Sequence, residues 1–193
     1  RGVLIPRDDT EVVVNLCIDF LENRTDKKTV DLCSGSGAIA VALDKISGAE
    51  VTAVEIDETA FSYLETNVKE NNSSVKPVMA DALKICETFA DGELDLIVSN
   101  PPYIKSADIE TLQKEVQLEP RLALDGGEDG CDFYREIVSR WSRKLKKGGA
   151  LAFELGENQA DAVKALMTDK GFSDFKISLD FGGVQRAIIG TLL

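Results

Sequence analysis

The chain has 193 residues, 44% of them hydrophobic, which suits one domain spanning residues 1–193 around a substantial core. Its net charge of −12 disfavours a function that depends on binding nucleic-acid backbones, because that binding needs clustered Lys and Arg. The absence of histidine excludes Ser-His-Asp and Cys-His nucleophiles and a His general base. The four cysteines are widely spaced, so we expect neither a zinc site nor disulfides, and a reducing, cytoplasmic compartment.

Three further features of the sequence limit the class of protein to which the chain can belong. No apolar run is long enough to span a bilayer and no signal peptide is visible, so we expect no membrane contact. The chain starts at Arg1 rather than Met, and we expect it to be a fragment of a longer protein. The basic cluster at 140–147 falls at the end of a predicted helix, where cations favour the helix dipole, so we expect no stable nucleic-acid partner.

The first half of the chain alternates apolar runs with amphipathic segments. An extended segment at 3–7 precedes a helix predicted to run to about Leu21, with Asp9 or Thr10 as its cap. Short apolar runs predict buried strands. The strands are predicted at 29–33, 50–55, 75–80 and 94–99, and the helices between them at 38–46 and 59–71.

The second half continues this alternation and then changes. A helix is predicted over 106–116, followed by a loop through 125–127. Apolar residues that recur every four positions predict one helix face, ended by Gly148-Gly149, with Trp141 as a core anchor. These residues are Phe133, Ile137, Trp141 and Leu145. The remaining elements are predicted as a strand at 150–155, a helix at 158–170, and strands at 173–179 and 185–191 that form a hairpin. The pattern predicts one α/β domain, with a parallel sheet covered on both faces and an antiparallel strand added by the hairpin.

A glycine-containing turn joins the first predicted strand to the next helix. Gly35 and Gly37 permit close approach of a ligand to the backbone, and Glu55 ends the following strand, where acidic residues commonly bind ribose hydroxyls. The pattern fits a dinucleotide loosely. However, the carboxylate of Asp31 is awkward beside a pyrophosphate and suits the cationic methionine end of S-adenosylmethionine. Asp81 ends the third strand, where it can accept a hydrogen bond from an adenine amino group.

The segment Ser99-Asn100-Pro101-Pro102-Tyr103 follows the fourth predicted strand. Proline cannot continue a strand ladder and holds its predecessor extended, so this segment predicts a rigid hook at the strand's carboxyl end. Open α/β sheets bind ligands at that edge. The hook would hold the Asn100 amide, which has one acceptor and two donors, at a fixed place in the crevice.

Four segments together resemble one family. They are V-L-I-P-R-D-D-T-E at 3–11, D-L-C-S-G-S-G-A-I-A at 31–40, V-S-N-P-P-Y-I at 98–104 and E-P-R-L-A-L-D-G-G-E-D-G at 119–130. In this order they resemble the HemK/PrmC family, the N5-glutamine methyltransferases of peptide-chain release factors. The resemblance covers nearly the whole chain. The N-P-P-Y motif alone is shared with amino-methylating DNA and RNA enzymes.

The resemblance implies a class I S-adenosylmethionine-dependent methyltransferase fold, Rossmann-like, with a seven-stranded sheet whose last two strands form the hairpin. It implies that the chain methylates the glutamine of the Gly-Gly-Gln motif in a release factor, leaving S-adenosylhomocysteine, with no metal ion. We expect it to act as a monomer. The family's N-terminal helical domain is absent from these residues.

The resemblance also implies roles for individual residues. Asn100, Pro101 and Tyr103 would be catalytic and, with Pro102 and Arg7, would hold the substrate glutamine. The cofactor would be bound by the strand-end residues Asp31, Cys33, Gly35, Gly37, Glu55, Asp81 and Asn100. Thr10 and Glu11 match the family's N-terminal motif without an assigned role. Cys33 stands where the family often has glycine and Asp8 where it has proline, and the side chain of Cys33 would narrow the glycine turn at its expected cofactor contact.

Three other functions remain as alternatives. An N6-adenine or N2-guanine methyltransferase could use the same hook on a flipped base of RNA or DNA. A cofactor-binding module without catalysis is a second alternative, and a turnover assay separates it from an enzyme. A dehydrogenase is the third. It needs a proton relay, and neither a histidine nor a Tyr-x-x-x-Lys pair is present for one.

Overall fold

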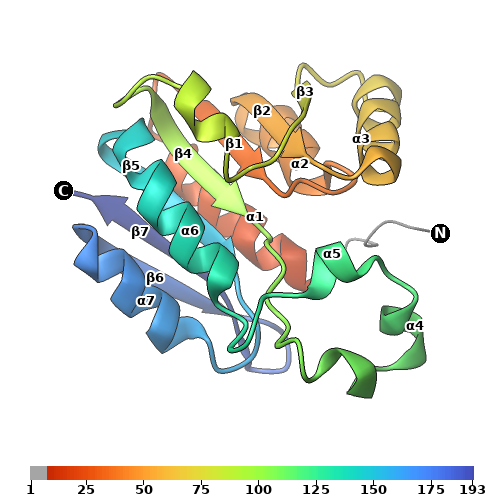
Figure 1. The fold of residues 1–193 in the computed structure, drawn as a ribbon. Helices are drawn as coiled ribbons and strands as arrows, with labels where there is room; N and C mark the ends of the chain where they lie inside the picture. Colours follow the sequence, from red (N-terminus) through yellow and green to blue (C-terminus); the bar gives the residue numbers. More distant parts are fainter. Residues whose placement is uncertain (1–7) are drawn as a thin grey trace.

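The computed structural model describes residues 8–193 (Figure 1). The predicted extended segment at 3–7, and with it Arg7, lies outside the described residues. Helices and strands alternate along the described chain. The strands are β1 Lys28–Leu32, β2 Glu50–Glu55, β3 Lys76–Met79, β4 Leu94–Ser99, β5 Leu145–Glu154, β6 Phe172–Leu179 and β7 Gln185–Leu192. The helices are α1 Asp8–Leu21, α2 Ala38–Ser47, α3 Glu58–Glu70, α4 Lys114–Gln117, α5 Arg121–Leu124, α6 Asp132–Trp141 and α7 Ala160–Asp169.

The described strands form one seven-stranded sheet in the order β3-β2-β1-β4-β5-β7-β6. β1 to β5 pair in parallel, and β7 is antiparallel to both β5 and β6. The predicted parallel sheet with a C-terminal antiparallel hairpin is therefore confirmed. No helix within residues 8–193 is long and apolar enough to cross a membrane.

The strand order reverses between β1 and β4, which lie side by side in the middle of the sheet. Such a reversal opens a crevice at the carboxyl ends of the two strands, because the chain leaves them toward opposite sides. A hydrogen bond of 2.7 Å from Ser99 Oγ to the carbonyl oxygen of Leu32 joins the two strand ends. This places Cys33 and Asn100, the next residues, on either side of the crevice.

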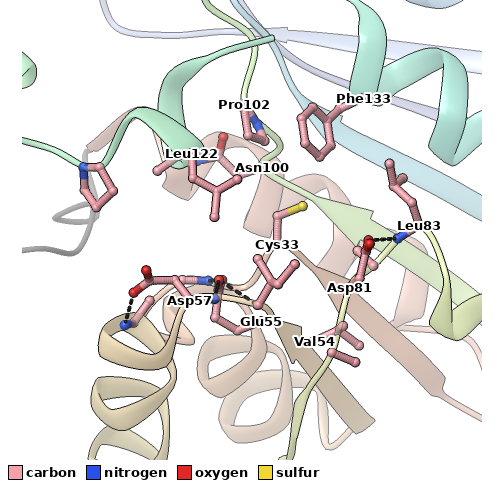
Figure 2. A pocket seen from close by; sticks show the side chains of 17 residues that line it. Cys33, Val54, Glu55, Asp57, Asp81, Leu83, Asn100, Pro102, Leu122 and Phe133 are labelled. Atoms are coloured by element: carbon pink, nitrogen blue, oxygen red, sulfur yellow. Dashed lines mark hydrogen bonds between the residues drawn. The ribbon is translucent and has the colours of Figure 1, made fainter.

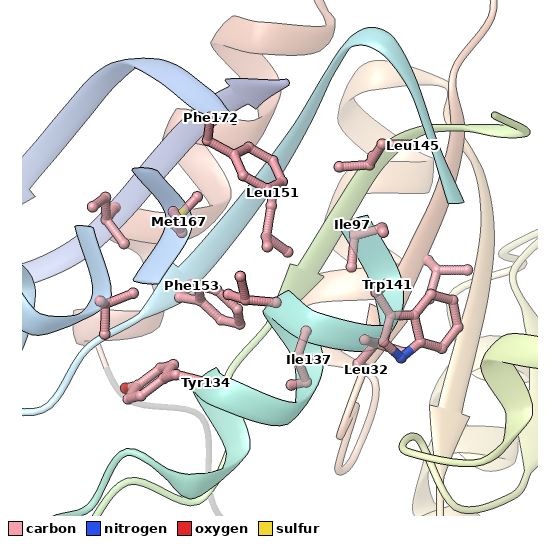
Figure 3. Packing of buried hydrophobic residues seen from close by; sticks show 14 of the residues in the cluster. Leu32, Ile97, Tyr134, Ile137, Trp141, Leu145, Leu151, Phe153, Met167 and Phe172 are labelled. Carbon is pink, nitrogen blue, oxygen red and sulfur yellow. The ribbon is translucent and has the colours of Figure 1, made fainter. Parts of the chain in front are cut away.

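Helices cover both faces of the sheet (Figure 1). One core lies under α1, α2 and α3 and includes Cys17, Leu43 and Leu64. The other lies under α6 and α7, where Tyr134 meets Phe153 edge to face at 5.1 Å between ring centroids (Figure 3). Trp141 is fully buried and donates from Nε1 to the Ala82 carbonyl oxygen at 2.9 Å, which confirms it as a core anchor.

Two predicted helices differ from the structure. The helix that carries Trp141 ends at that residue, and a 3-10 turn at Ser142–Lys144 leads straight into β5. Leu145 is therefore a strand residue, and Gly148-Gly149 lies inside β5. The predicted helix was too long because the fourfold apolar spacing continues by chance from α6 across the turn to Leu145. The segment 106–116 forms a 3-10 turn at Ile109–Thr111 and the short α4 instead of one helix, and α5 lies in the predicted loop.

Candidate active site

Two adjoining cavities open at the carboxyl edge of the sheet. The larger, of about 240 Å³, is lined by residues that follow β1, β2, β3 and β4 (Figure 2). The smaller, of about 40 Å³, lies at the start of α2 and is also lined by Thr10 of α1. Both cavities are lined by Cys33, Gly35 and Asn100. The junction of the two cavities is therefore at the strand reversal, between the glycine turn and the hook.

The glycine turn reaches the cavities through Cys33 to Ser36. Gly35 has a φ of 54° and open space where a Cβ would lie, so its backbone is accessible from both cavities. Cys33 also has a positive φ, 57°, which is strained for a residue with a side chain. Gly37, the other predicted contact of the turn, lines neither of these two cavities: its missing Cβ makes room for Leu64 of α3, so Gly37 packs against that helix.

Glu55 holds the glycine turn against β2. Its Oε2 accepts a hydrogen bond from the backbone N–H of Gly35 at 2.7 Å, and its Oε1 accepts from Ile56 and Asp57, each at 2.8 Å. The carboxylate lines the larger cavity and keeps one acceptor site, on Oε2, for a further hydrogen bond (Figure 2). Asp57 lines the same cavity and caps α3 by accepting from Ala60 N–H at 2.9 Å. Sequence reasoning missed Asp57, although an acidic residue before a helical pattern was a usable signal.

Asp81 lines the other side of the larger cavity. Its Oδ1 accepts from Leu83 N–H at 2.9 Å, and its Oδ2 forms an ion pair with Lys84 at 3.0 Å. Burial raises the pKa of Asp81, but the hydrogen bonds from Lys84 and Leu83 outweigh it and hold the pKa below its usual value. Asp81 is therefore ionised at neutral pH and presents an acceptor to the cavity.

Asp31 lies beneath the glycine turn and is fully buried. Its Oδ2 accepts from Ala40 N–H in the first turn of α2 at 3.1 Å, whereas its Oδ1 has no hydrogen-bond partner among the described residues. Burial raises the pKa of Asp31 to about 8, and the neighbouring charge of Glu55 adds to the shift. An unpartnered buried carboxylate oxygen is costly, and a cationic ligand group nearby would lower that cost.

Two polar side chains of the turn differ in character. Burial raises the pKa of Cys33 to about 12, so its thiol stays neutral at the junction of the cavities. Ser34 lines the smaller cavity, and its buried Oγ has no hydrogen-bond partner in the described part of the chain. The smaller cavity therefore offers a hydroxyl that is free to bind a polar ligand.

The hook runs from the junction of the cavities into the protein. Asn100 lines both cavities, and Pro102 lines the larger one (Figure 2). Pro101 and Pro102 are buried, and Tyr103 is half-buried behind them. The Tyr103 hydroxyl lies 3.4 Å from Glu154 Oε1. The structure thus brings Asn100 to the cavity junction and holds Tyr103 against the end of β5.

Close packing from two other segments, 126–130 and 156–159, fixes Tyr103. A Cβ on Gly126 would lie 2.7 Å from Tyr103 Cα, and one on Gly130 would collide with the Tyr103 carbonyl oxygen. Gln159 Nε2 donates to that same carbonyl at 2.9 Å, and its Oε1 accepts from Gly156 N–H at 2.9 Å. Gly126 and Gly130 of the D-G-G-E-D-G segment are therefore needed so that the chain can lie directly on the hook.

Glu154 lies behind the hook and was not predicted. It is 3% exposed at the end of β5, and its Oε2 accepts from Thr10 Oγ1 at 2.7 Å. Thr10 therefore contacts the site from within α1 through its side chain, rather than capping that helix. The only sequence signal for Glu154 was a charged residue at the end of an apolar strand.

The cavity wall opposite Glu55 is apolar. Pro120, Leu122 and Ala123 of the α5 segment and Phe133 of α6 line it (Figure 2). A wall of this kind suits a flat aromatic ring better than a phosphate group. The candidate site thus combines carboxylates that bind polar groups with an apolar slot.

The family described as "Methyltransferase small domain" matches residues 7–128. A protein of Clostridium acetobutylicum named release factor glutamine methyltransferase is 36% identical over 192 residues, which cover 98% of this chain and 67% of that protein. The chain belongs to the release factor glutamine methyltransferase family. Another member, from Geobacter sulfurreducens, is 41% identical over 193 residues, 99% of this chain and 66% of its own length. The chain thus spans about two thirds of the length of these relatives.

Solved structures share the fold of this methyltransferase domain. A methyltransferase from Pyrococcus furiosus superimposes with a TM-score of 0.67 at 22% identity, covering 92% of this chain and 82% of that one. The hMettl16 catalytic domain, solved with an RNA hairpin, superimposes with a TM-score of 0.75 at 16% identity. The match covers 100% of this chain and 73% of that one. These similarities show the class I methyltransferase fold predicted from the sequence.

Proposed function

We propose that this chain transfers a methyl group from S-adenosylmethionine to the side-chain amide nitrogen of the glutamine in the Gly-Gly-Gln motif of a release factor. The observation that carries the proposal is the position of Asn100. It lies where a cavity suited to an adenosine meets the smaller cavity that Ser34 and Thr10 line, at the start of the hook, and Gln159 holds the Tyr103 carbonyl of the hook from behind. The names of the relatives in this family supply the class of protein substrate.

The described residues fit this cofactor. We assign Glu55 to the ribose hydroxyls, because its carboxylate faces the larger cavity with one acceptor site left on Oε2. Asp81 would accept from the adenine amino group, and the apolar wall would cover the ring. The unpartnered Ser34 Oγ and the backbone of Gly35 would receive the methionine end in the smaller cavity. Asp31, buried beneath the turn, would ionise as the cationic methionine end binds, because that positive charge lowers the pKa of its carboxyl, and would then stabilise the cation electrostatically.

When bound, S-adenosylmethionine supplies an electrophilic methyl group on a sulfonium sulfur. The amide nitrogen is a poor nucleophile, because its lone pair is delocalised into the carbonyl, so the protein's task is orientation. In our proposal the Asn100 side-chain oxygen and the Pro101 carbonyl each accept one amide hydrogen, and Tyr103 packs against the amide plane. The methyl group would pass from the sulfonium to the oriented nitrogen, and one of the two amide hydrogens held by Asn100 and Pro101 would leave for solvent as a proton. No strong base is required.

A nucleic-acid substrate is disfavoured by the charge distribution. In the basic cluster near β5, Arg140 pairs with Glu136 at 2.6 Å and Arg143 with Glu87 at 2.7 Å. Lys144 is buried and contacts Asp91 at 2.7 Å, and Lys146 contacts Asp95 at 2.9 Å. These cations are already neutralised by acidic residues and offer little to a phosphate backbone.

The experiment that tests the function is transfer of labelled methyl from S-adenosylmethionine by the full-length protein. The substrates are a release factor with Gly-Gly-Gln, the same factor with that glutamine changed to alanine, and total RNA. We expect label only on the unmodified factor. Label on RNA would overturn the proposal and assign the hook to a base. Cofactor binding without transfer to any substrate would indicate a binding module.

A further inference from the structure

Glu154 and Asn100 occupy adjacent positions at the ends of neighbouring parallel strands. Ser99 of β4 pairs with Phe153 of β5, so the next residue on each strand is Asn100 and Glu154. Neighbouring strands lie about 4.8 Å apart, and paired residues point to the same face. The buried Glu154 carboxyl is therefore beside the Asn100 amide, on the side away from the cavities.

The other groups at this carboxyl are hydrogen-bond donors. Thr10 Oγ1 donates to Oε2 at 2.7 Å, and the Tyr103 hydroxyl approaches Oε1 at 3.4 Å. An ionised carboxylate has only acceptors, whereas the Asn100 amide has an acceptor at one end and donors at the other. The carboxylate thus favours the amide orientation with the –NH₂ group toward Glu154.

We propose that Glu154 is a positioning residue that sets the orientation of the Asn100 amide, so that Asn100 Oδ1 faces the reacting nitrogen of the substrate. This inference rests on the proposed function for its catalytic consequence. The orientation itself is a property of the protein without substrate. With the opposite orientation, Asn100 would present donors to an amide –NH₂ group, which cannot accept them, and the nitrogen would lose one of its two supports.

The charge state of Glu154 decides the orientation. Burial raises the pKa of Glu154 above its usual value, Asp9 raises it further, and hydrogen bonds from Thr10, Tyr103 and Asn100 oppose the shift. A protonated Glu154 can donate to Asn100 Oδ1 and would turn the amide around.

Other titratable groups adjoin the Glu154 carboxyl from the packed elements. On α6, the buried Tyr134 hydroxyl donates to the Glu154 backbone carbonyl at 2.9 Å. On β7, Arg186 pairs with Asp9 at 3.4 Å and with Asp180 at 2.9 Å. Because the Arg186 guanidinium pairs with Asp9 and Asp180, it does not directly compensate the charge of Glu154.

The kinetic test compares the unmodified protein with Glu154→Gln and Glu154→Asp. Glutamine can offer either a donor or an acceptor to Asn100, so we expect kcat to fall about 10- to 100-fold. The affinity for S-adenosylhomocysteine should change less than about threefold, since Glu154 does not line the cavities. The unmodified protein should lose kcat on the acid side as Glu154 becomes protonated, and Glu154→Gln should lack that loss. Glu154→Asp should keep the acid loss, because it keeps a carboxylate.

Asp95→Asn is the matched control. Asp95 is a 4%-exposed carboxylate at the opposite end of β4, where it accepts from Lys146 at 2.9 Å. Its loss should lower the melting temperature without changing kcat or the pH profile. If Glu154→Gln keeps the kcat and pH profile of the unmodified protein, or behaves like Asp95→Asn, the proposal is wrong.

A second measurement needs no turnover. In the unmodified protein, the Asn100 side-chain –NH₂ resonances should shift with pH at a midpoint above the usual glutamate value, and those of exposed Asn71 should not. Absence of that titration would overturn the inference even if the release factor is methylated. Its presence with no methylation of the release factor would leave the orientation supported and the proposed function rejected.

Discussion

Thr10 Oγ1 donates a 2.7 Å hydrogen bond to Glu154 Oε2 across 144 positions of the chain. It joins the first described helix to the strand behind the hook, and Thr10 also lines the smaller cavity. One carboxylate therefore contacts a wall of the smaller cavity and the Tyr103 hydroxyl of the hook. We therefore expect substitutions of Thr10, Glu154 or Tyr103 to alter the geometry at the cavity junction.

Asn100→Ala should lower kcat about 100-fold or more, because the amide nitrogen loses an acceptor that holds its lone pair in line. Affinity for S-adenosylhomocysteine should fall less than about threefold, because Asn100 is only one of many residues that line the cavities. Transfer assays and calorimetry measure the two quantities. Asn71→Ala, at the exposed end of α3, is the control. Equal losses of kcat and of affinity would contradict the assignment.

Gly130→Ala should lower kcat more than Gly92→Ala. Both glycines have a positive φ, 77° and 70°, so both substitutions strain the backbone to a similar extent. Only the Cβ at Gly130 would collide with the Tyr103 carbonyl and approach Gln159 Nε2, at 2.6 Å, whereas Gly92 has open space. We expect a larger loss of melting temperature in Gly130→Ala, because its Cβ meets backbone atoms, and a kcat loss of about tenfold confined to that variant. Comparable kcat for the two variants would show that the contact does not position the hook.

Asp31→Asn should stabilise the protein at high pH. The folded-state pKa of about 8 lies above the unfolded value of 3.8, so the contribution of Asp31 to stability is full below pH 3.8 and is lost as pH rises toward 8. Asparagine does not ionise, so the free energy of unfolding of Asp31→Asn should exceed that of the unmodified protein by more at pH 8.5 than at pH 5. Urea unfolding at both pH values measures this difference, and an equal difference would contradict the burial of an ionisable Asp31.

Glu55→Gln should weaken binding of S-adenosylhomocysteine about 10-fold or more. Glutamine has one acceptor oxygen in place of two, so it cannot accept from Gly35, Ile56 and Asp57 and also serve the ribose. Calorimetry gives the affinity. Glu58→Gln, in the exposed first turn of α3, is the control. An unchanged affinity would remove Glu55 from the ribose site.

The strand ends and the residues that follow them were predictable, because their signals are local. A buried run followed by Asn-Pro-Pro predicts both the end of β4 and the hook, and the glycines after β1 predict the turn. The amphipathic pattern failed at Leu145, where a 3-10 turn separates α6 from β5 without a glycine or proline to mark it.

The partners behind the hook depend on which strand ends become neighbours. Glu154 lies beside Asn100 because β4 and β5 pair in parallel, and Gln159 and Gly130 reach Tyr103 from segments that pack there only after folding. Burial, likewise, follows from packing: Asp31 and Gly37 belong to the glycine-turn motif, yet one lies beneath the turn and the other against Leu64. Local residue patterns thus specify the groups that can contact a ligand. The pairing of distant strands specifies which groups orient those ligand-contacting side chains. Strand register and close packing bring together residues that are far apart in the sequence, so no local pattern can reveal them.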